Sequence, residues 1–273
     1  MTSHTLSTPV HRPPNTGSPP GPTPTQTSAQ PRQLTKGGIL AVWAAAALPM
    51  GLLMWVVGPA LSHHMHGPQA LTRALILCIA AGLVWQFVLV VALVGREQRT
   101  LRWSTIREVL WLRAPRSSRT GRTGGRLWLI IIPLIVGVAA EEMIPSLPHS
   151  ANHDLATILQ SSTGQHFLVG SWMWFAVLVV MFVFNTVLGE ELLFRGYLLP
   201  RMNDAFGKRD WVANGVLFAA YHLHRPWIIP NALCDMFFLA YPSKRFRSAW
   251  LGIAVHSVQT VVFTVVALTV VLK

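Results

Sequence analysis

Residues 171–188 form a run of eighteen amino acids that carry no charge, and such a run is long enough to enter a lipid bilayer as a helix. Two carboxylates, Glu190 and Glu191, follow almost at once, and Arg195 comes four residues later. Because the chain then stays apolar until Pro200, we place these charges inside the helix rather than beyond its end. An ionisable group at that depth costs about 2.5–3.5 kcal/mol, which makes it a candidate for a functional site.

Long apolar runs recur along the chain. Hydrophobic residues make up 52% of it and charged residues only 12%, roughly half the charged share of an ordinary soluble domain. We therefore predict an all-α fold, a polytopic bundle of about seven transmembrane helices. An eighth helix within residues 145–168 stays open at this point. The predicted spans cover residues 39–61, 70–95, 127–140, 171–200, 211–222, 227–241 and 249–272.

The ends and connections of the chain have a different composition. Residues 1–36 are rich in Pro, Thr and Ser and are predicted to be a disordered cytoplasmic tail, whereas residues 37–273 form the membrane-embedded domain. A net charge of +12 would indicate nucleic acid as the partner of a soluble protein. Here Lys and Arg gather in short connections between apolar runs, which favours retention of these connections on the cytoplasmic side. The expected partner is therefore the lipid bilayer and not nucleic acid.

The same asymmetry predicts a multi-pass protein of the cell membrane with its N-terminus in the cytoplasm. The arginine-rich segment 96–126 is expected to lie against anionic lipid headgroups, and residues 97–112 have the spacing of an amphipathic surface helix. Residues 141–170 contain no Lys or Arg and are expected on the opposite side. In that region Glu141 and Glu142 are interpreted as a solvated or interfacial helix end.

An acid and two imidazoles are predicted to lie at similar depth in three different helices. Counted at about 1.5 Å per helical residue, Glu190, His222 and His256 are each roughly 13–20 Å from the basic side of the membrane. We therefore expect them to face one another across a shared cavity. Taken alone, an intramembrane histidine is often only a hydrogen-bonding group between helices. The convergence of three such groups favours a catalytic site.

Spacing within each helix separates the roles of these residues. Glu191 and Arg195 are four residues apart, so they share a helix face and form a predicted ion pair. Glu190 has only Phe194 at that spacing, which leaves its carboxylate free to take a proton from water. His256 and Thr260 share a face and could point at one developing oxyanion, while His222 could orient the attacking water or protonate the leaving amine.

Three motifs in this order resemble those of the CPBP intramembrane proteases, the CAAX-processing and bacteriocin-processing (Abi) family. The run EELLFRGYLLPR from Glu190 resembles the family's EExxxR motif, and FAAYH, from Phe218 to His222, resembles its FxxxH motif. His256 resembles the histidine of the closing HxxxN/D motif. The resemblance covers about residues 171–265, the protease-like core. In one departure, Thr260 stands where the family has Asn or Asp, with Gln259 beside it.

The resemblance implies an intramembrane endopeptidase that cuts membrane-associated peptides or proteins, lipidated ones included. Glu190 would activate the water, His222 would assist and His256 would stabilise the oxyanion. The supporting residues would be Glu191, Arg195, Thr260, Gln259 and Phe218. We favour a mechanism without a metal cofactor. The alternative is Zn²⁺ held by the three catalytic residues, which come from separate helices without an HExxH spacing.

Two other classes of function remain open on sequence grounds. One is a membrane scaffold or immunity protein that keeps the family fold without catalysis. The other is a proton-coupled transporter that uses the same acids and histidines. A transporter is expected to show internal repeats with interrupted helices in matching positions, and the sequence shows none.

Overall fold

The computed structural model describes residues 1, 31–67, 69–141, 143–150 and 153–273. Within them the regular structure is helical, apart from one isolated bridge between Arg116 and Thr123. The longer elements are α1 (Lys36–Leu52), α3 (Ala70–Gln98), α5 (Ile131–Glu141), α8 (Trp172–Val183), α10 (Asp210–Tyr221) and α13 (Ala249–Val271). The short α-helices are α2 (Gly58–Ser62), α4 (Trp103–Val109), α6 (Leu155–Gln160), α7 (Ser162–Leu168), α9 (Asn203–Phe206), α11 (Ile229–Asp235) and α12 (Tyr241–Phe246).

The remaining elements are tighter or wider helical turns. The π-type segments are η1 (Leu53–Val57), η4 (Phe184–Gly189), η5 (Leu192–Leu198) and η10 (Met236–Ala240). The 3₁₀ segments are η2 (Gly125–Ile130), η6 (Leu199–Arg201), η7 (Gly207–Arg209), η8 (His222–His224) and η9 (Pro226–Ile228).

Four continuous helices in the described part of the chain are long and apolar enough to cross a membrane. They are Lys36–Ser62, Ala70–Gln98, Trp172–Arg201 and Ala249–Val271. Large apolar side chains stay exposed along them, among them Leu48, Val88, Val180 and Val262, as expected where lipid rather than protein covers a helix face. The chain is thus a helical membrane protein, as predicted, although length and apolarity alone identify four spans and not seven.

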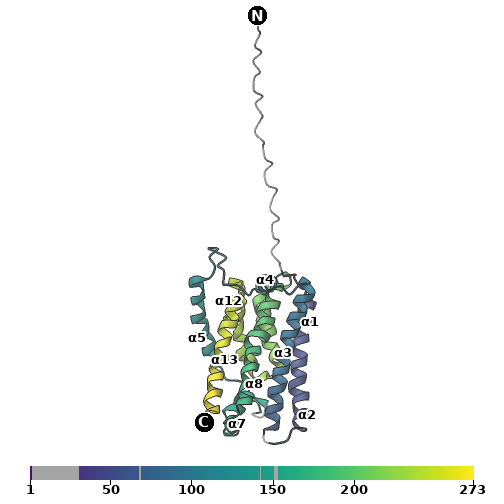
Figure 1. Cartoon of the computed structure of the whole chain (residues 1–273), viewed down its shortest axis with the longest axis vertical. Helices are drawn as coiled ribbons and strands as arrows, with labels where there is room; N and C mark the ends of the chain where they lie inside the picture. The colour runs from purple at the N-terminus through teal and green to yellow at the C-terminus, as the bar shows by residue number, and fades with distance from the viewer. Residues whose placement is uncertain (2–30, 68, 142, 151–152) are drawn as a thin grey trace.

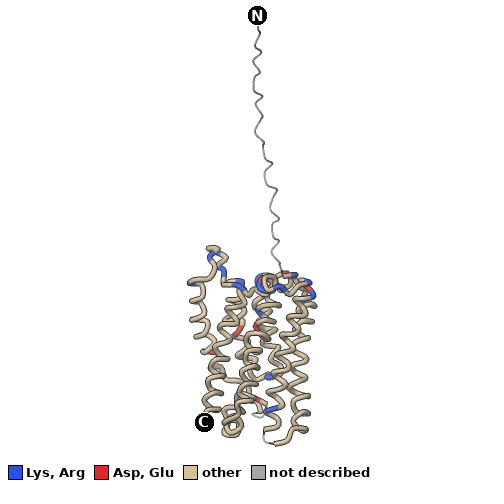
Figure 2. Tube along the Cα trace, viewed as in Figure 1, with Lys and Arg blue, Asp and Glu red and all other residues tan. Residues whose placement is uncertain are grey.

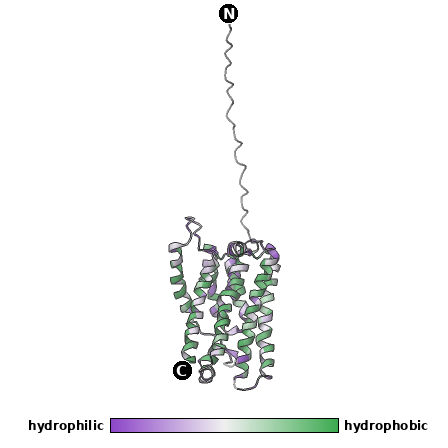
Figure 3. Cartoon of the chain, in the orientation of Figure 1, coloured by the Kyte–Doolittle hydropathy of each residue, from purple (hydrophilic) through white to green (hydrophobic). Residues whose placement is uncertain are grey.

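The helices pack side by side into one bundle, with the start of α1 at one end and the C-terminus at the other (Figure 1). Lys and Arg gather at the end where α1 begins (Figure 2). Hydrophobic residues cover the helices between the two ends (Figure 3). Inside the bundle, α3 packs against η4, and α13 packs against α5, α8 and η10.

Two predicted elements differ in the structure. The proposed eighth span is instead two short helices, α6 and α7, of 6 and 7 residues. At about 1.5 Å per residue each is roughly 10 Å long and too short to cross a bilayer. The surface helix predicted for residues 97–112 is only α4, because Arg99 has a positive φ of 53° that ends α3 and turns the chain.

The basic end of the bundle also holds the last residues of the predicted tail. The backbone N–H of Arg32 donates to Glu97 at 2.8 Å, and that of Leu34 donates to the carbonyl of Arg201 at 3.0 Å. Arg201 is itself fully buried and pairs with Glu97 at 2.8 Å. Residues 2–30, which make up most of the predicted tail, lie outside the described residues.

Candidate active site

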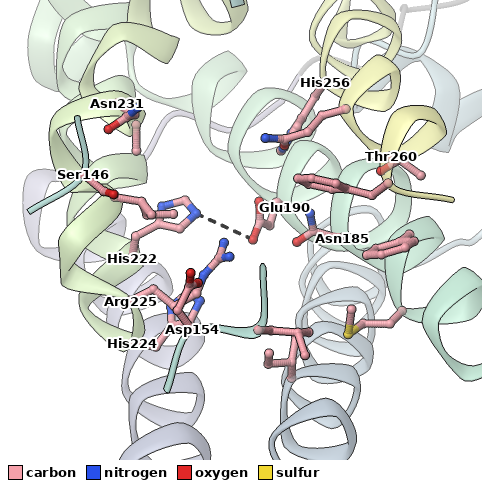
Figure 4. A pocket seen from close by; sticks show the side chains of 18 of the residues that line it. Ser146, Asp154, Asn185, Glu190, His222, His224, Arg225, Asn231, His256 and Thr260 are labelled. Atoms are coloured by element: carbon pink, nitrogen blue, oxygen red, sulfur yellow. Dashed lines mark ion pairs between the residues drawn. The ribbon is translucent and has the colours of Figure 1, made fainter. Parts of the chain in front are cut away.

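A cavity of about 340 Å³ lies inside the bundle, and the three predicted catalytic residues all line it. Glu190 lies between η4 and η5, His222 begins η8 at the end of α10, and His256 lies in α13. Phe218, Gln259 and Thr260 also line the cavity. Figure 4 shows Glu190 and His222 pointing toward each other, with His256 on the neighbouring wall.

Glu190 and His222 face each other without a direct hydrogen bond. The Oε1 atom of Glu190 lies 4.0 Å from Nε2 of His222, a distance too long for one. On the other side of the imidazole, Nδ1 is 2.9 Å from the carbonyl oxygen of Phe218. Because a carbonyl only accepts, Nδ1 carries the proton in the neutral ring, and the lone pair on Nε2 then faces Glu190.

Glu190 has a tyrosine of another helix near it. Tyr221 of α10 lies close enough to Glu190 for the two groups to interact electrostatically, and its hydroxyl receives a hydrogen bond of 2.5 Å from Nε2 of Gln86 in α3. Both Gln86 and Tyr221 are fully buried. Sequence spacing cannot find this contact, because Gln86 is more than a hundred residues from Glu190 and the partners meet only when α3 packs against η4.

Glu191 points away from the cavity and joins two other motif residues. Its Oε1 accepts hydrogen bonds from Arg195 Nη1 at 2.9 Å and from His256 Nδ1 at 3.0 Å. Glu191 and Arg195 are fully buried. The predicted pair with Arg195 is therefore present. The contact to His256, which the sequence analysis did not anticipate, orients that imidazole and leaves its Nε2 as the free ring nitrogen.

Phe218 connects the three motifs. The guanidinium of Arg195 stacks on its ring at 4.0 Å from the centroid, and the rings of His222 and His256 meet it edge to face at 4.8 and 6.2 Å. A cation over an aromatic face is attracted to the negative face of the ring. This contact gives a physical reason for a phenylalanine four residues before the histidine: its ring holds Arg195 while its backbone carbonyl orients His222.

The backbone around the two glutamates is wider than an ideal α-helix. The π-type segments η4 and η5 lie directly before and after Glu190 and Glu191. Such widened turns are rare and frequently occur at functional sites. Because the turn is wider, the roughly 100° per residue of an ideal α-helix does not predict the direction in which the Glu190 and Glu191 side chains point. Their different directions depend instead on the packing of neighbouring helices.

Thr260 and Gln259 lie at the site but are not equivalent. The hydroxyl of Thr260 donates to Oγ1 of Thr186 at 3.1 Å, so its single proton is directed to a neighbouring helix rather than to the cavity. Gln259 lines the cavity directly beside it.

Sequence reasoning missed two charged residues that line the cavity. Arg225 follows His222 by three residues, and Asp154 begins α6. Burial acts to raise the pKa of Asp154, but hydrogen bonds from Thr157 and the charges of Arg225 and His149 outweigh it and lower the pKa overall. Arg225 could have been predicted at the site, because it is a charged residue only three positions after the histidine of the FxxxH motif. Nothing in the sequence connects Asp154 to the site.

Glu141 is interpreted from the sequence as part of a solvated or interfacial helix end, and the structure buries it instead. It is only 9% exposed and also lines the cavity, because α5 packs against α13 and η10. The expectation for its neighbour Glu142 falls outside the described residues.

The side chains do not form a ready metal site as they lie. Within the described ranges, no group of three or more His, Cys, Asp or Glu residues is arranged to hold a metal ion. His256 directs Nδ1 to Glu191 and His222 directs Nδ1 to a carbonyl, so the Zn²⁺ set considered from sequence would need Nε2 of both rings and Glu190 to approach one another.

Comparison with known proteins agrees with this geometry. Residues 171–262 match the family described as type II CAAX prenyl endopeptidase Rce1-like, and this segment holds the glutamates, Phe218 and both histidines. No curated protein and no solved structure matches the chain significantly. The resemblance noted in the sequence is thereby confirmed: the segment from residue 171 to residue 262 is similar to the Rce1-like family of CAAX prenyl endopeptidases.

Proposed function

We propose that the protein is an intramembrane endopeptidase in which Glu190 activates the attacking water. The observation that carries the proposal is the pair formed by Glu190 and His222, whose facing atoms are 4.0 Å apart across a polar corner of a largely apolar cavity. That separation suits two groups that share one water molecule. A carboxylate and an imidazole so placed meet the geometric requirement for general acid–base catalysis.

The proton and bond changes follow from this arrangement. Glu190 takes one proton from the water as its oxygen attacks the scissile carbonyl carbon, and the carbonyl oxygen becomes an oxyanion. Collapse of this intermediate breaks the C–N bond, and the leaving nitrogen receives the proton, directly from Glu190 or through His222. The products are a carboxyl group and an amine, and no oxidant or reductant is needed.

His256 is the candidate donor to the oxyanion. Its Nδ1 is held by Glu191, which in turn is held by Arg195, so the ring is fixed before substrate arrives. In the protonated ring Nε2–H is then the available donor, and fixed donors of this kind lower the barrier because they need no reorganisation. Gln259 is the candidate second donor in this chain, since the proton of Thr260 is used by Thr186.

We further propose that the chain crosses the membrane seven times with its N-terminus in the cytoplasm. In Figure 1, α1, α3, α5, α8 and α13 run along the bundle, and the proposed further crossings are α10 and the α11–α12 segment. An odd number of crossings fits termini at opposite ends. α1 begins at the basic end of the bundle (Figure 2). Basic connections are retained on the cytoplasmic side of a membrane, which supports a cytoplasmic location for the N-terminus.

The proposed substrate is a membrane-associated protein that carries a prenyl group, as the description of the matched family indicates. Apolar residues of four helices line much of the cavity, among them Leu83, Phe182, Leu239 and Val266. A lipid-modified chain could therefore approach the polar corner from an apolar environment.

Replacing Glu190 tests the proposal. Glu190→Gln keeps the size of the side chain but removes the base, and loss of general-base catalysis lowers rates by about 10²–10⁴-fold. We expect cleavage of a prenylated fluorogenic CAAX-type peptide by the purified protein to fall at least about 100-fold while the peptide still binds. Retention of full activity would remove Glu190 from the mechanism, and a wild-type protein that binds but never cleaves would support the scaffold function instead.

A matched control and a chelator complete the experiment. Glu108→Gln changes a glutamate that pairs with Arg113 at the basic surface, far from the motifs in the chain, and is expected to leave cleavage unchanged. The same assay with a chelator separates the glutamate mechanism from a metal-dependent one. Stoichiometric zinc in the purified protein together with activity lost to the chelator would contradict the mechanism without a metal.

A further inference from the structure

Arg225 is a cation in the cavity that the catalytic steps do not use. It is the only Lys or Arg among the described residues that line the cavity. Its charge acts on both Glu190 and Asp154. Figure 4 shows its side chain extending toward Glu190 from the side of Asp154.

The hydrogen-bonding capacity of this guanidinium is not filled by the protein. Its Nε is buried and has no hydrogen-bond partner, and no acid among the described residues forms an ion pair with it. A buried donor without a partner costs about 1–3 kcal/mol, which a ligand with two acceptor oxygens would recover.

The nearby acid Asp154 is committed elsewhere. Its Oδ2 accepts hydrogen bonds from the backbone N–H and the hydroxyl of Thr157 and lies 3.5 Å from Nε2 of His149. It caps α6 and balances the charge of Arg225 from a distance. The five donors of a guanidinium form a rigid fork that matches a carboxylate, and Asp154 does not occupy this fork.

The position of Arg225 relative to His222 is set by the backbone. Its N–H donates to the carbonyl of His222 at 2.7 Å, so the two residues belong to one tight turn. A 3₁₀ turn rises about 2.0 Å per residue, whereas an extended peptide covers about 3.3–3.6 Å per residue. Three residues at that rise span roughly 6 Å, so a group held by Arg225 lies about two substrate residues from the bond that faces His222.

From these contacts we propose that Arg225 binds a carboxylate of the substrate close to the scissile bond and so determines which peptides are cut. The proposal rests on the proposed protease function. The carboxylate has two possible sources, the C-terminal α-carboxylate of the substrate or an acidic side chain near the cut, and both offer the same two oxygens to the guanidinium.

Three versions of one prenylated fluorogenic peptide test this assignment: a free C-terminal acid, the C-terminal amide, and the amide with Glu in one of the last three positions. We expect the wild-type protein to cleave a carboxylate-bearing version with a kcat/KM at least about tenfold above that of the plain amide, mainly through a lower KM. Preference for the free acid or for the Glu-containing amide identifies the source of the carboxylate.

Variants of Arg225 then assign the preference to this residue. In Arg225→Gln the ratio between the preferred peptide and the plain amide is expected to fall close to one, and in Arg225→Lys to an intermediate value, because an ammonium keeps the charge but not the fork. Arg73→Gln is the matched control: Arg73 also has a buried Nε without a partner, but it donates to the carbonyl of His66 and does not line the cavity. Its ratio should equal that of the wild type.

Binding measurements keep this test independent of catalysis. Glu190→Gln protein, with and without Arg225→Gln, is titrated with the labelled acid and amide peptides. A lower Kd for the carboxylate-bearing peptide that disappears in the double variant supports the proposal, even if no peptide is cleaved. A lack of cleavage would count against the protease function and not against carboxylate binding by Arg225. Equal preference in wild type and Arg225→Gln, or no preference in the wild type, would overturn it.

Discussion

Glu190 and Glu191 are neighbours in the chain but have separate surroundings. Glu190 faces the cavity, His222 and Tyr221, whereas Glu191 is enclosed by Arg195 and His256. The second acid thus holds an imidazole in place while the first lines the cavity. This division gives a physical reason for two adjacent carboxylates in the motif, and it makes Tyr221 the next residue to examine.

Tyr221→Phe is expected to lower kcat about tenfold with little change in KM. Gln86 donates to the tyrosine oxygen, so the tyrosine proton is available to the nearby Glu190 during the reaction, and a hydrogen bond to a charged group is worth about 1.5–3 kcal/mol. The aromatic ring, which packs on Phe194, remains. Kinetics on the prenylated peptide measure kcat and KM, and the thermal unfolding midpoint measures whether stability is retained.

Tyr241→Phe is the control for this substitution, because Tyr241 in α12 is 47% exposed and packs on Trp211. An unchanged kcat in Tyr221→Phe would exclude the tyrosine from the support of Glu190.

At the level of elements, α13 approaches the helix of the two glutamates unusually closely. A Cβ added at Gly252 would lie 2.4 Å from Oε2 of Glu191 and 3.2 Å from Cγ of Arg195. The first distance is shorter than real Cβ contacts allow, so this glycine lets α13 bring His256, four residues on, to within 3.0 Å of Glu191.

Gly252→Ala is therefore expected to displace Glu191, to lower stability by about 1–3 kcal/mol as overpacking does, and to reduce cleavage at least about tenfold. Gly51→Ala in α1, where nothing lies within 4 Å of the added carbon, is expected to be neutral or stabilising by up to about 1 kcal/mol. Thermal unfolding and peptide cleavage of both variants provide the comparison. A Gly252→Ala protein as stable and active as the wild type would show that the two helices are not held at this distance.

For the whole molecule, the separation of basic and neutral ends predicts sidedness in the membrane. A cysteine placed at exposed Thr120, in the basic connection, should react with an impermeant maleimide only after the membrane is permeabilised. One placed at exposed Ser150, in the segment without Lys or Arg, should react in intact cells. The unsubstituted chain, whose Cys78 is buried and Cys234 partly so, reports background labelling. Labelling of both sites from the same side would contradict seven crossings.

Much of the site was predictable because its residues are marked by their type and spacing. A charge within an apolar run is costly, so Glu190, Glu191 and Arg195 stand out without any structure, and the i to i+4 pairing of Glu191 with Arg195 follows from helix geometry. The contact of His256 with Glu191, the link from Gln86 through Tyr221 to Glu190, and the presence of Arg225, Asp154 and Glu141 at the cavity were not predictable. Each depends on which helices become neighbours and on the widened turns η4 and η5.

The amino-acid sequence by itself determined that this protein is a helical membrane protein and which few polar groups enter the apolar interior, because the cost of placing charge in lipid depends on composition along one helix. Only the tertiary structure decided which acid faces the cavity, which imidazole each acid meets and which cation lines the cavity. Those contacts join residues far apart in the chain, and their distances are set by close packing between helices, as at Gly252, rather than by any local pattern.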